Sequence, residues 1–595
     1  MDAPTAGMSS TNGHHAGPSP GRVPPHQRPP SSGPFVARPS GDAPGGTTRF
    51  IGAAVHLDHT LAEGLIEEFL VEPCRSIPRT PGVDAASVLG DAAASHRRRQ
   101  VRDATLMVLA VVVMVALPWM ATAWLVLGVL GAVIVRARSG EPLSRGRVVG
   151  LTVLLVAAGG LAVLVQIALA TVNAMASLGS SGSFGSSGYA SPAVNAEVSP
   201  WGVVGALALL AIPVIIATDE VLVLSLIRRH FSRSRFTPEP DEGPGFVASL
   251  RRIGRARFHR MLERTRDAER IDDMSMADVV VFRGDDPFVG AGVRYKVNSH
   301  VIPLEKKDDE PGPPRISPRD LHLAVTAAVN DLRRVSSLGL HGRLNTMLHR
   351  EQCLVAAYEL LTHHREAEAG VYLPHGPHGA PAATLPLAVA RRGIDDPREW
   401  ARYYQCYRVE GWERDLTLSC FFTLGTDGRL LYLEWVTYVL APLDRNYRIV
   451  DDRRALQQRA LRTALVDIIT FPVSIPRRLR RVFRTFAPVA AAADAQAPEA
   501  LGAAISVREM AAGPLEDYFR SADVLRYSKL FDRAILEAIR RYLDENGLKI
   551  ADIDQIVQSI TIGNVNNSVL AVGEHNSATG QAPNPASAAA QSKGT

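Results

Sequence analysis

The chain has 595 residues, and its 65 Lys and Arg against 60 Asp and Glu give a formal net charge of +5. The basic residues are almost all arginines, a bias that GC-rich coding produces, so the charge gives no case for nucleic acid as a partner. The cysteines (Cys74, Cys353, Cys406 and Cys420) lie far apart and none is in a CxxC motif, which argues against a disulfide scaffold or a cysteine zinc site.

The two ends of the chain, 1–48 and 579–595, consist largely of Pro, Gly, Ser, Ala and Asn, with almost no large apolar side chains. Such segments cannot bury enough surface to offset chain entropy, so both are predicted to be disordered. Residues 49–103 are predicted to be a cytoplasmic helical segment before the membrane, in which Leu61 and Leu65 share one helix face.

Three long apolar stretches follow, within 104–136, 148–176 and 201–227. Each has at least the roughly 20 residues that a helix needs to cross about 30 Å of hydrocarbon. The first is too long for one straight crossing and has Pro118 near its middle, so it is predicted to be a hairpin of two short helices, either re-entrant or fully crossing. With a transmembrane helix in each of the other two stretches, the sequence predicts an α-helical membrane domain of four hydrophobic helices.

Arginine clusters flank the first stretch and follow the third, whereas the Ser/Gly loop 177–200 has no Lys or Arg. By the positive-inside rule this loop is extracellular, and the protein is a multi-pass cell-membrane protein with both termini in the cytoplasm. Asp219 and Glu220 lie near the end of the third stretch. Since residues 201–218 alone would cover about 27 Å, we interpret the pair as interfacial, in preference to an intramembrane functional site.

Residues 246–490 are predicted to form a cytoplasmic α+β domain, so the expected fold is an α-helical membrane domain plus an α+β domain, with disordered termini. The clearest β signal is 415–440, where apolar and polar residues alternate before a turn at Gly425–Gly428 and a second strand follows it. Residues 401–412 are expected to pair with this hairpin as a third strand.

The β region also supplies candidate pocket residues. Glu434 lies in the middle of a predicted strand and is a candidate buried carboxylate, for which neutralisation by Arg408 is favoured over a catalytic role. The loop 285–292, with the sequence DDPFVGAG, adds Asp285 and Asp286. Its glycines are not followed by the Gly-Lys-Ser/Thr of a P-loop, so a tight strand connection is favoured over a phosphate loop.

Motifs for known chemistries are missing from the sequence. It contains no G-x-S-x-G, H-E-x-x-H, P-loop or EF-hand pattern. The His-rich loop 372–379 has no acidic or cysteine partner at zinc-type spacing, so a solvated loop is favoured over a metal site. We therefore assign no catalytic residue, cofactor or metal.

The segment 475–486 combines apolar residues at helical spacing with a set of arginines, which is typical of a helix that lies in a membrane interface. Its arginines would meet anionic lipids of the inner leaflet. A surface helix packed on the β domain is an equal alternative. The apolar residues are Leu479, Val482, Phe483 and Phe486, and the basic ones are Arg477, Arg478, Arg480, Arg481 and Arg484.

The last ordered segments are predicted to be a helical region over 506–547, ended by Gly547, and a short β-forming tail over 558–578. In the tail, short β-forming runs alternate with Asn/Gly turns. One copy could bury little surface alone, so the tail is expected to associate with other copies and to make the protein a homo-oligomer.

Several of these motifs occur together in a known group of proteins. They are the basic segment that enters an apolar hairpin, DDPFVGAG at 285–292, YRVEGW at 407–412 and LYLEWVTYVLAPL at 431–443. With them, roughly residues 50–575 resemble a family of uncharacterised multi-pass membrane proteins from actinobacteria such as Streptomyces. The resemblance implies location and architecture only, and no activity or catalytic residue.

Three functions remain open. The first is a non-enzymatic, membrane-anchored cytoplasmic scaffold or sensor. The second is a membrane-associated enzyme with a pocket on the β domain, for which Glu434, Arg408 and the loop 285–292 are the candidates. The third is a channel or transporter, which four helices with few polar residues could form only as an oligomer.

Overall fold

The computed structural model describes residues 46–138, 200–237, 246–270, 275–307, 316–334, 344, 347–412, 414–484, 486 and 498–566. These residues belong to one compact unit, Ala37–Thr595. The predicted transmembrane helix over 148–176, the Ser/Gly loop that was predicted to be extracellular and nearly all of both tails lie outside them.

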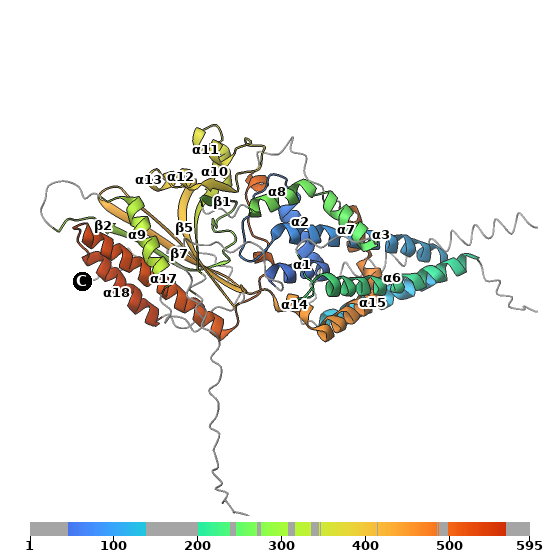
Figure 1. Ribbon diagram of the computed structural model, residues 1–595. Coiled ribbons are helices and arrows are strands. Elements are labelled where there is room, and N and C mark those ends of the chain that lie inside the picture. Colours follow the sequence, from blue (N-terminus) through green and yellow to red (C-terminus); the bar gives the residue numbers. More distant parts are fainter. Residues whose placement is uncertain are drawn as a thin grey trace, which may run out of the picture. The chain divides into compact units, whose positions relative to one another are not determined.

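Within the described residues, seven strands form one mixed sheet in the order β2-β7-β6-β5-β3-β1-β4 (Figure 1). β1 and β3 are parallel, and the other neighbouring pairs are antiparallel. The strands are β1 (Met276–Phe282), β2 (Val293–Pro303), β3 (Leu348–Ala356), β4 (Thr384–Pro386), β5 (Ala401–Gly411), β6 (Leu416–Thr426) and β7 (Leu430–Leu440).

The hairpin of β6 and β7 confirms the β signal predicted over 415–440, and β5 pairs with β6 as the expected third strand. At the turn, the carboxylate of Asp427 accepts hydrogen bonds from the backbone N–H groups of Arg429 and Leu430, at 2.8 and 2.7 Å. Gly428 has a φ of +86°, a conformation that glycine adopts without steric cost. The local sequence therefore determines where the chain reverses.

One face of the sheet packs against helices. Alternate strand residues such as Tyr407, Phe422 and Trp435 are buried there beneath α9 (Pro318–Asp331), α17 (Tyr518–Glu545) and α18 (Ala551–Asn566) (Figure 1). Near β1 and β3, short helices bury a separate apolar cluster. These are α10 (Ala357–Thr362), α11 (Ala367–Tyr372), α12 (Leu387–Ala390), α13 (Arg392–Asp395) and α16 (Pro498–Leu501).

The C-terminal elements differ in part from the prediction. α17 ends at Glu545 and Gly547 has a φ of +70°, as the sequence indicates. The expected β-forming run at the start of 558–578 is wrong, because residues up to Asn566 belong to α18. Ile553, Ile556 and Val557 follow the helical i, i+3, i+4 spacing and pack on the sheet core. This helical pattern continues into the residues that were predicted to form a strand. Residues 567–578 lie outside the described part.

Five helices build a second core. The first half of α3 (Ala85–Ala116) packs against α1 (Thr47–Leu57), α2 (His59–Phe69), α7 (Phe246–Ala256) and α8 (His259–Arg270). Side chains such as Leu65, Phe69, Leu89 and Met261 are buried between them. Asp58 and Asp84 cap α2 and α3 by accepting hydrogen bonds from backbone N–H groups of the first turn, as acidic N-caps do.

The predicted α-helical membrane domain of four hydrophobic helices is wrong. Among the described helices only α6 (Pro200–His230) is long and apolar enough to cross a bilayer. α4 (Pro118–Arg138) has a shorter apolar part, Pro118–Ile134. α3 contributes only its last residues, because its first half is buried in the helical core just described. The described chain is instead a mixed α/β structure around a seven-stranded sheet, and the predicted helix break is found at Leu117.

The amphipathic segment predicted over 475–486 is the last part of a longer helix, α15 (Arg453–Phe483), which contains Pro472 and Pro476. α15 packs against α3, α4 and α6, and its Phe471 is buried among them. A short helix, α14 (Arg445–Arg448), and a 3-10 turn (Ile449–Asp451) connect β7 to α15.

Candidate functional site

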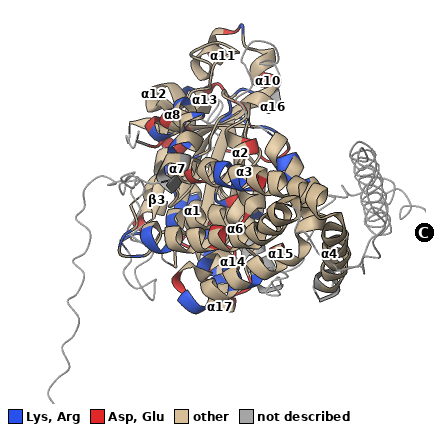
Figure 2. Ribbon diagram, turned by 90° about the vertical axis from the view of Figure 1, so that its right-hand side faces the viewer, with Lys and Arg blue, Asp and Glu red and all other residues tan. Residues whose placement is uncertain are grey.

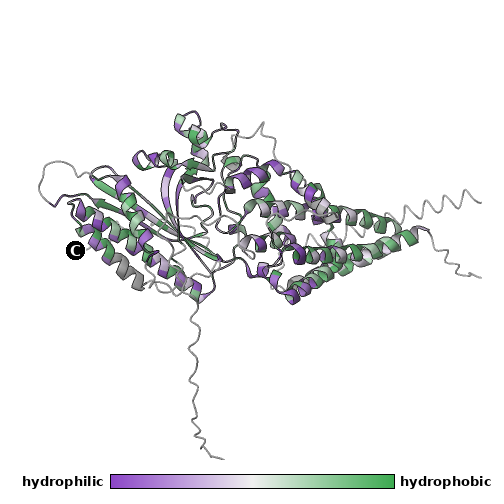
Figure 3. Cartoon of the chain, in the orientation of Figure 1, coloured by the Kyte–Doolittle hydropathy of each residue, from purple (hydrophilic) through white to green (hydrophobic). Residues whose placement is uncertain are grey.

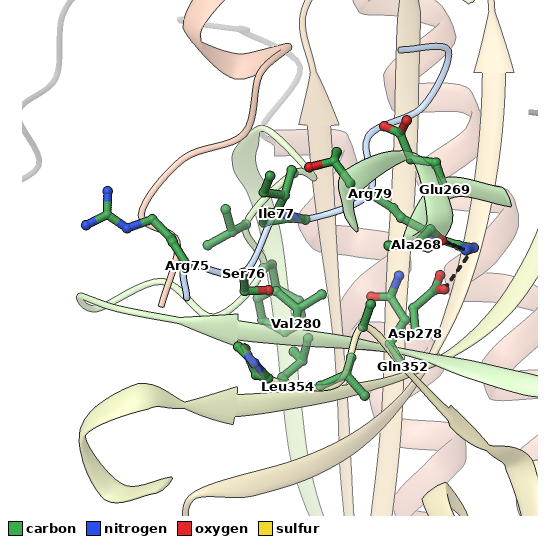
Figure 4. A pocket seen from close by; sticks show the side chains of 18 of the residues that line it. Arg75, Ser76, Ile77, Arg79, Ala268, Glu269, Asp278, Val280, Gln352 and Leu354 are labelled. Atoms are coloured by element: carbon green, nitrogen blue, oxygen red, sulfur yellow. Dashed lines mark hydrogen bonds and ion pairs between the residues drawn. The ribbon is translucent and has the colours of Figure 1, made fainter. Parts of the chain in front are cut away.

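A pocket of about 70 Å³ lies on the face of the sheet that α9 and α17 leave open, and we call it the sheet pocket. Its floor consists of side chains of β1, β3, β5 and β6. The segment 75–79, the loop 288–291 and α8 form its walls (Figure 4). The polar groups around it are mainly Arg75, Arg79, Arg264, Glu269, Asp278, Gln352 and Arg408.

Asp278 is the buried carboxylate of the sheet pocket. It lies on β1 and forms an ion pair with Arg79, with 3.2 Å between the guanidinium nitrogen and the carboxylate oxygen (Figure 4). Burial raises the pKa of Asp278, although Arg79 and Arg408 act in the opposite direction. A buried carboxyl beside two guanidinium groups is the kind of group that enzymes use, but ion pairs of purely structural role show it as well.

Glu269 also lines the sheet pocket, but its carboxylate forms its hydrogen bond with the helical core. It accepts a hydrogen bond of 2.7 Å from the backbone N–H of Ala85 at the start of α3, and it lies apart from Asp278 (Figure 4). Burial, and next the nearby carboxylate of Asp84, raise the pKa of Glu269 to about 8. The two carboxylates of the pocket lining are therefore not a convergent acid–base pair.

The structure separates the pocket residues that the sequence suggested. Arg408 lines the sheet pocket and donates to the hydroxyl of Ser419 at 3.4 Å. Glu434 accepts a hydrogen bond of 3.1 Å from the Tyr404 hydroxyl, so the expected neutralisation of Glu434 by Arg408 is not what the structure shows. The reason is strand register, since Arg408 is opposite Ser419 whereas Glu434 is opposite Thr423.

The two aspartates of the loop 285–292 also lie away from the pocket lining. Asp285 is exposed, and Asp286 accepts a hydrogen bond of 2.9 Å from the Tyr438 hydroxyl. Between them and the glycines, Phe288 packs on the sheet with its ring 4.5 Å from that of Phe421. Only the part of this loop from Phe288 to Ala291 contributes to the sheet pocket.

The glycines of this loop bind a carboxylate of the same chain. The backbone N–H groups of Gly290 and Gly292 donate to the Glu509 carboxylate at 3.0 and 2.7 Å, and Ser506 N–H donates at 2.7 Å. A Cβ on Gly292 would lie only 2.2 Å from the carbonyl oxygen of Val439. Glu509 thus occupies the donors that a phosphate loop would offer. The loop connects β1 to β2, which are separated by four strands in the sheet, so it is not a tight turn between neighbouring strands.

Sequence reasoning missed the main charged residues of the sheet pocket. Arg75 and Arg79 are about 200 positions from Asp278, and no local pattern connects them. The one available signal was Asp278 itself, because a carboxylate at the start of the apolar run ADVVVF requires a partner when the strand is buried. Among the described residues, no group of three or more His, Cys, Asp or Glu could hold a metal ion.

A second feature is an exposed apolar surface on the far ends of α3, α4 and α6 and on α15, which we call the apolar surface (Figure 3). Its large side chains are between 45% and 73% exposed, and the described part of α4 carries no charge along Pro118–Ile134 (Figure 2). They include Val108, Val111, Trp119, Leu127, Trp201, Leu207, Leu210, Val214 and Leu461.

The residues predicted for a membrane interface are divided between two environments. Leu479 and Phe483 are exposed, together with Arg477 and Arg480. Val482 is half-buried, and Phe486 is buried. The other three arginines form ion pairs within the chain: Arg478 with Asp103 and Asp467, Arg481 with Glu63 and Asp103, and Arg484 with Glu63 and Glu67.

A comparison with known protein families finds a match for the second half of the chain. Residues 297–577 match the AbeC-like domain, a family of uncharacterised function. The match begins within β2 and includes β3 to β7, α15, α17 and α18, whereas β1 and the helices α3, α4 and α6 precede it. No curated protein and no solved structure matches the chain. Residues 297–577 therefore resemble an AbeC-like domain, and the match does not include the helical part before them.

Proposed function

We propose that the protein is a non-enzymatic module that associates with a lipid bilayer through the apolar surface and holds the sheet beside it. The observation that carries this proposal is the exposure of large apolar side chains on neighbouring helices. Water-soluble proteins rarely expose contiguous apolar patches larger than a few hundred Å², whereas membrane-facing surfaces require them. α6, which is long and apolar enough to cross a bilayer, is the central element of this surface.

Anionic lipids are the second part of the proposal. Arg477 and Arg480 are exposed beside the exposed Leu479 and Phe483, so apolar and basic groups reach the solvent together at the end of α15. This combination favours contact with anionic headgroups. We place the sheet on the cytoplasmic side, as in the actinobacterial family that the sequence resembles, because of the arginines that flank the apolar stretches.

Membrane fractionation of the full chain tests the proposal. The variant Leu207→Asp/Leu210→Asp places two charges on the exposed side of α6, and we expect it to move from the membrane fraction to the soluble or aggregated fraction. The matched control is Leu323→Asp, because Leu323 is 57% exposed on α9 beside the sheet. Wild-type protein that is fully recovered without membranes, and that has no affinity for phosphatidylcholine vesicles, would contradict the proposal.

A second candidate function is an enzyme with its site in the sheet pocket, favoured by the buried Asp278 and its raised pKa. The pocket of about 70 Å³ is small beside the roughly 300–1,000 Å³ of typical ligand sites. A screen of small metabolites for thermal stabilisation of the protein distinguishes the two functions. A ligand whose effect disappears in Asp278→Asn would support the enzyme.

Self-association through 558–578 stays a proposal, and we now assign it to the residues after α18. A chain that ends at Asn566 keeps the packing of Ile553 on the sheet core. Light scattering in detergent should then show a smaller assembly than for the full chain. Equal masses for the two proteins would contradict self-association through this tail.

A further inference from the structure

A cavity of about 220 Å³ lies among α3, α6 and α15, and we call it the arginine cavity. α3 lines it with Arg98, Arg99 and Arg102. α15 adds Arg459, Arg477, Arg478 and Arg481. Because one water needs about 10–15 Å³, the cavity has room for a group much larger than a single water.

Positive charge exceeds negative charge in the arginine cavity. Asp219, Glu220 and Asp467 line it, and the fully buried Asp103 bonds to three of its arginines. Glu63 also bonds to one of them, Arg481. Among the described residues, seven arginines against five carboxylates therefore leave an excess of two positive charges. Such an excess in a partly enclosed space is costly unless an anion compensates it, since burial removes the screening by water.

Two carboxylates are each shared by several arginines. Asp219 accepts from Arg98 and from Arg102, the latter at 2.8 Å. Asp103 accepts from Arg478 and Arg481, at 2.7 and 2.8 Å. These bonds hold guanidinium groups of α3 and α15 in place around one space, with carboxylates of α3 and α6 as their acceptors. The arrangement is therefore fixed before any ligand arrives, which reduces the entropy cost of binding.

Arg99, Arg459 and Arg477 form no ion pair with a carboxylate of the described residues, and Arg99 is the buried one of these three. Its Nη2 donates to the backbone carbonyls of Val55 and His56, at 3.2 and 2.7 Å. Its Nη1 has no hydrogen-bond partner among the described residues, although Arg99 is only 5% exposed. Burial, followed by repulsion from Arg98, Arg102 and Arg481, lowers the pKa of Arg99 to about 9, so the group is still charged at neutral pH. A buried cation with a free donor fits an anion.

The arginine cavity lies at the edge of the apolar cluster that joins α3, α6 and α15. Leu106 of that cluster is one turn from Asp103 on α3, and Ile216 is one turn from Asp219 on α6. At the rim, Arg477 is exposed. The cationic cavity is therefore directly beside apolar helices. If these helices enter a bilayer, the phosphate groups of the lipids would lie at the level of the cavity.

We propose that the arginine cavity binds one phosphate-type oxyanion, through Arg99 inside the cavity and Arg477 at its rim. Guanidinium groups bind phosphate oxygens with two parallel N–H donors, which suits a cavity built from arginines rather than lysines. The anion is either free phosphate or the phosphate of an anionic lipid headgroup. The lipid source rests on the proposed membrane association, whereas binding of the free anion does not.

The test uses the full chain in a neutral detergent. Isothermal titration with inorganic phosphate, at constant ionic strength, should show one saturable site. We expect Arg99→Gln and Arg477→Gln each to raise the Kd at least tenfold. Arg477 is exposed, so its variant keeps the fold even if Arg99→Gln does not. Arg462→Gln is the matched control, because Arg462 is exposed on the same helix and does not line the cavity.

A second arm compares phosphatidylcholine vesicles with and without phosphatidic acid. Stronger binding to the phosphatidic acid vesicles, lost in Arg477→Gln, identifies a lipid source even if free phosphate is bound only weakly. Binding of phosphate in detergent with no lipid preference identifies the free anion. The proposal is overturned if phosphate does not bind and phosphatidic acid has no effect, or if the control variant is affected equally. Attachment to neutral vesicles would then still leave the membrane proposal intact.

Discussion

Gly290 and Gly292 have φ values of +96° and +94°, and both direct their N–H groups at the carboxylate of Glu509. The loop is thus complete only when the segment after α16 packs against it. Burial raises the pKa of Glu509, while hydrogen bonds from Ser506, Gly292 and Gly290 oppose the shift. The N–H groups of these glycines could donate to an external phosphate. Here they donate to Glu509 and so connect the loop 285–292 to the segment after α16.

We predict that Glu509→Ala destabilises the protein by about 1–3 kcal/mol, because buried backbone donors lose their acceptor. Chemical denaturation in detergent measures the loss. Glu509→Gln keeps one acceptor oxygen and should lose less. As a control, Glu537→Ala removes an exposed carboxylate from α17 and should change the free energy of unfolding by no more than about 0.5 kcal/mol. An equal effect of Glu509→Ala and Glu537→Ala would refute the role of Glu509.

Glu269 is expected to make the stability of the folded protein depend on pH. Its pKa is about 8 in the folded chain and 4.5 in the reference state, so the folded state keeps a proton that the unfolded state has lost between these values. The unfolded state binds fewer protons there, and the contribution of Glu269 to stability is therefore lost as the pH rises from 4.5 to about 8. Below pH 4.5 the contribution is fully present.

We expect Glu269→Gln to remove this slope. The melting temperature of the wild type should fall from pH 5 to pH 8 more steeply than that of the variant, because glutamine can accept from Ala85 without ionising. Differential scanning calorimetry at several pH values measures both slopes. Parallel pH profiles for the two proteins would show that Glu269 ionises normally.

At the scale of elements, the three helices around the arginine cavity are connected by ion pairs as well as by an apolar cluster. Asp103 on α3 bonds to Arg478 and Arg481 on α15, and Asp219 on α6 bonds to Arg98 and Arg102 on α3. The acidic pair at 219–220 therefore has an arginine partner on α3. An ion pair between helices remote in sequence has no local signature, which explains why the interfacial interpretation from sequence could not identify it.

We predict that Asp103→Ala destabilises the protein by about 3–5 kcal/mol, the usual cost of removing one partner from a buried ion pair. Arg102, Arg478 and Arg481 would then share no carboxylate. The double variant Asp103→Ala/Arg478→Met should recover part of the loss, because it removes one of the positive charges that Asp103 balanced, although Arg478 also pairs with Asp467. Strictly additive effects in this double-mutant cycle would mean that Asp103 and Arg478 do not interact.

Elements with strong local signals were predicted well. The alternation in 415–440 indicated β6 and β7, and Gly547 indicated the end of α17. The sheet pocket could not be predicted, because it combines Arg79 with Asp278 across a long sequence separation. Hydropathy also misjudged the first apolar stretch, since it does not reveal that the first half of α3 is buried in a helical core.

At the scale of the whole molecule, the tryptophans separate the apolar surface from the sheet. Trp119 and Trp201 are 73% and 70% exposed on α4 and α6, whereas Trp400 and Trp435 are buried near or within the sheet. Trp119 and Trp201 are each the second residue of their helix. If the apolar surface enters a bilayer, these two indoles are more exposed to lipid tails than the partly buried Trp124 of α4.

We therefore predict that brominated phosphatidylcholine quenches part of the tryptophan fluorescence of the reconstituted protein. Trp119→Phe/Trp201→Phe should remove most of the quenchable emission, and Trp400→Phe should leave it nearly unchanged, because bromine quenches only at close range. Both sets of substitutions retain an aromatic ring, so loss of fold does not explain a difference. Equal quenching in all three proteins, or none in the wild type, would mean that α4 and α6 do not face lipid. The apolar surface would then have to be covered by protein.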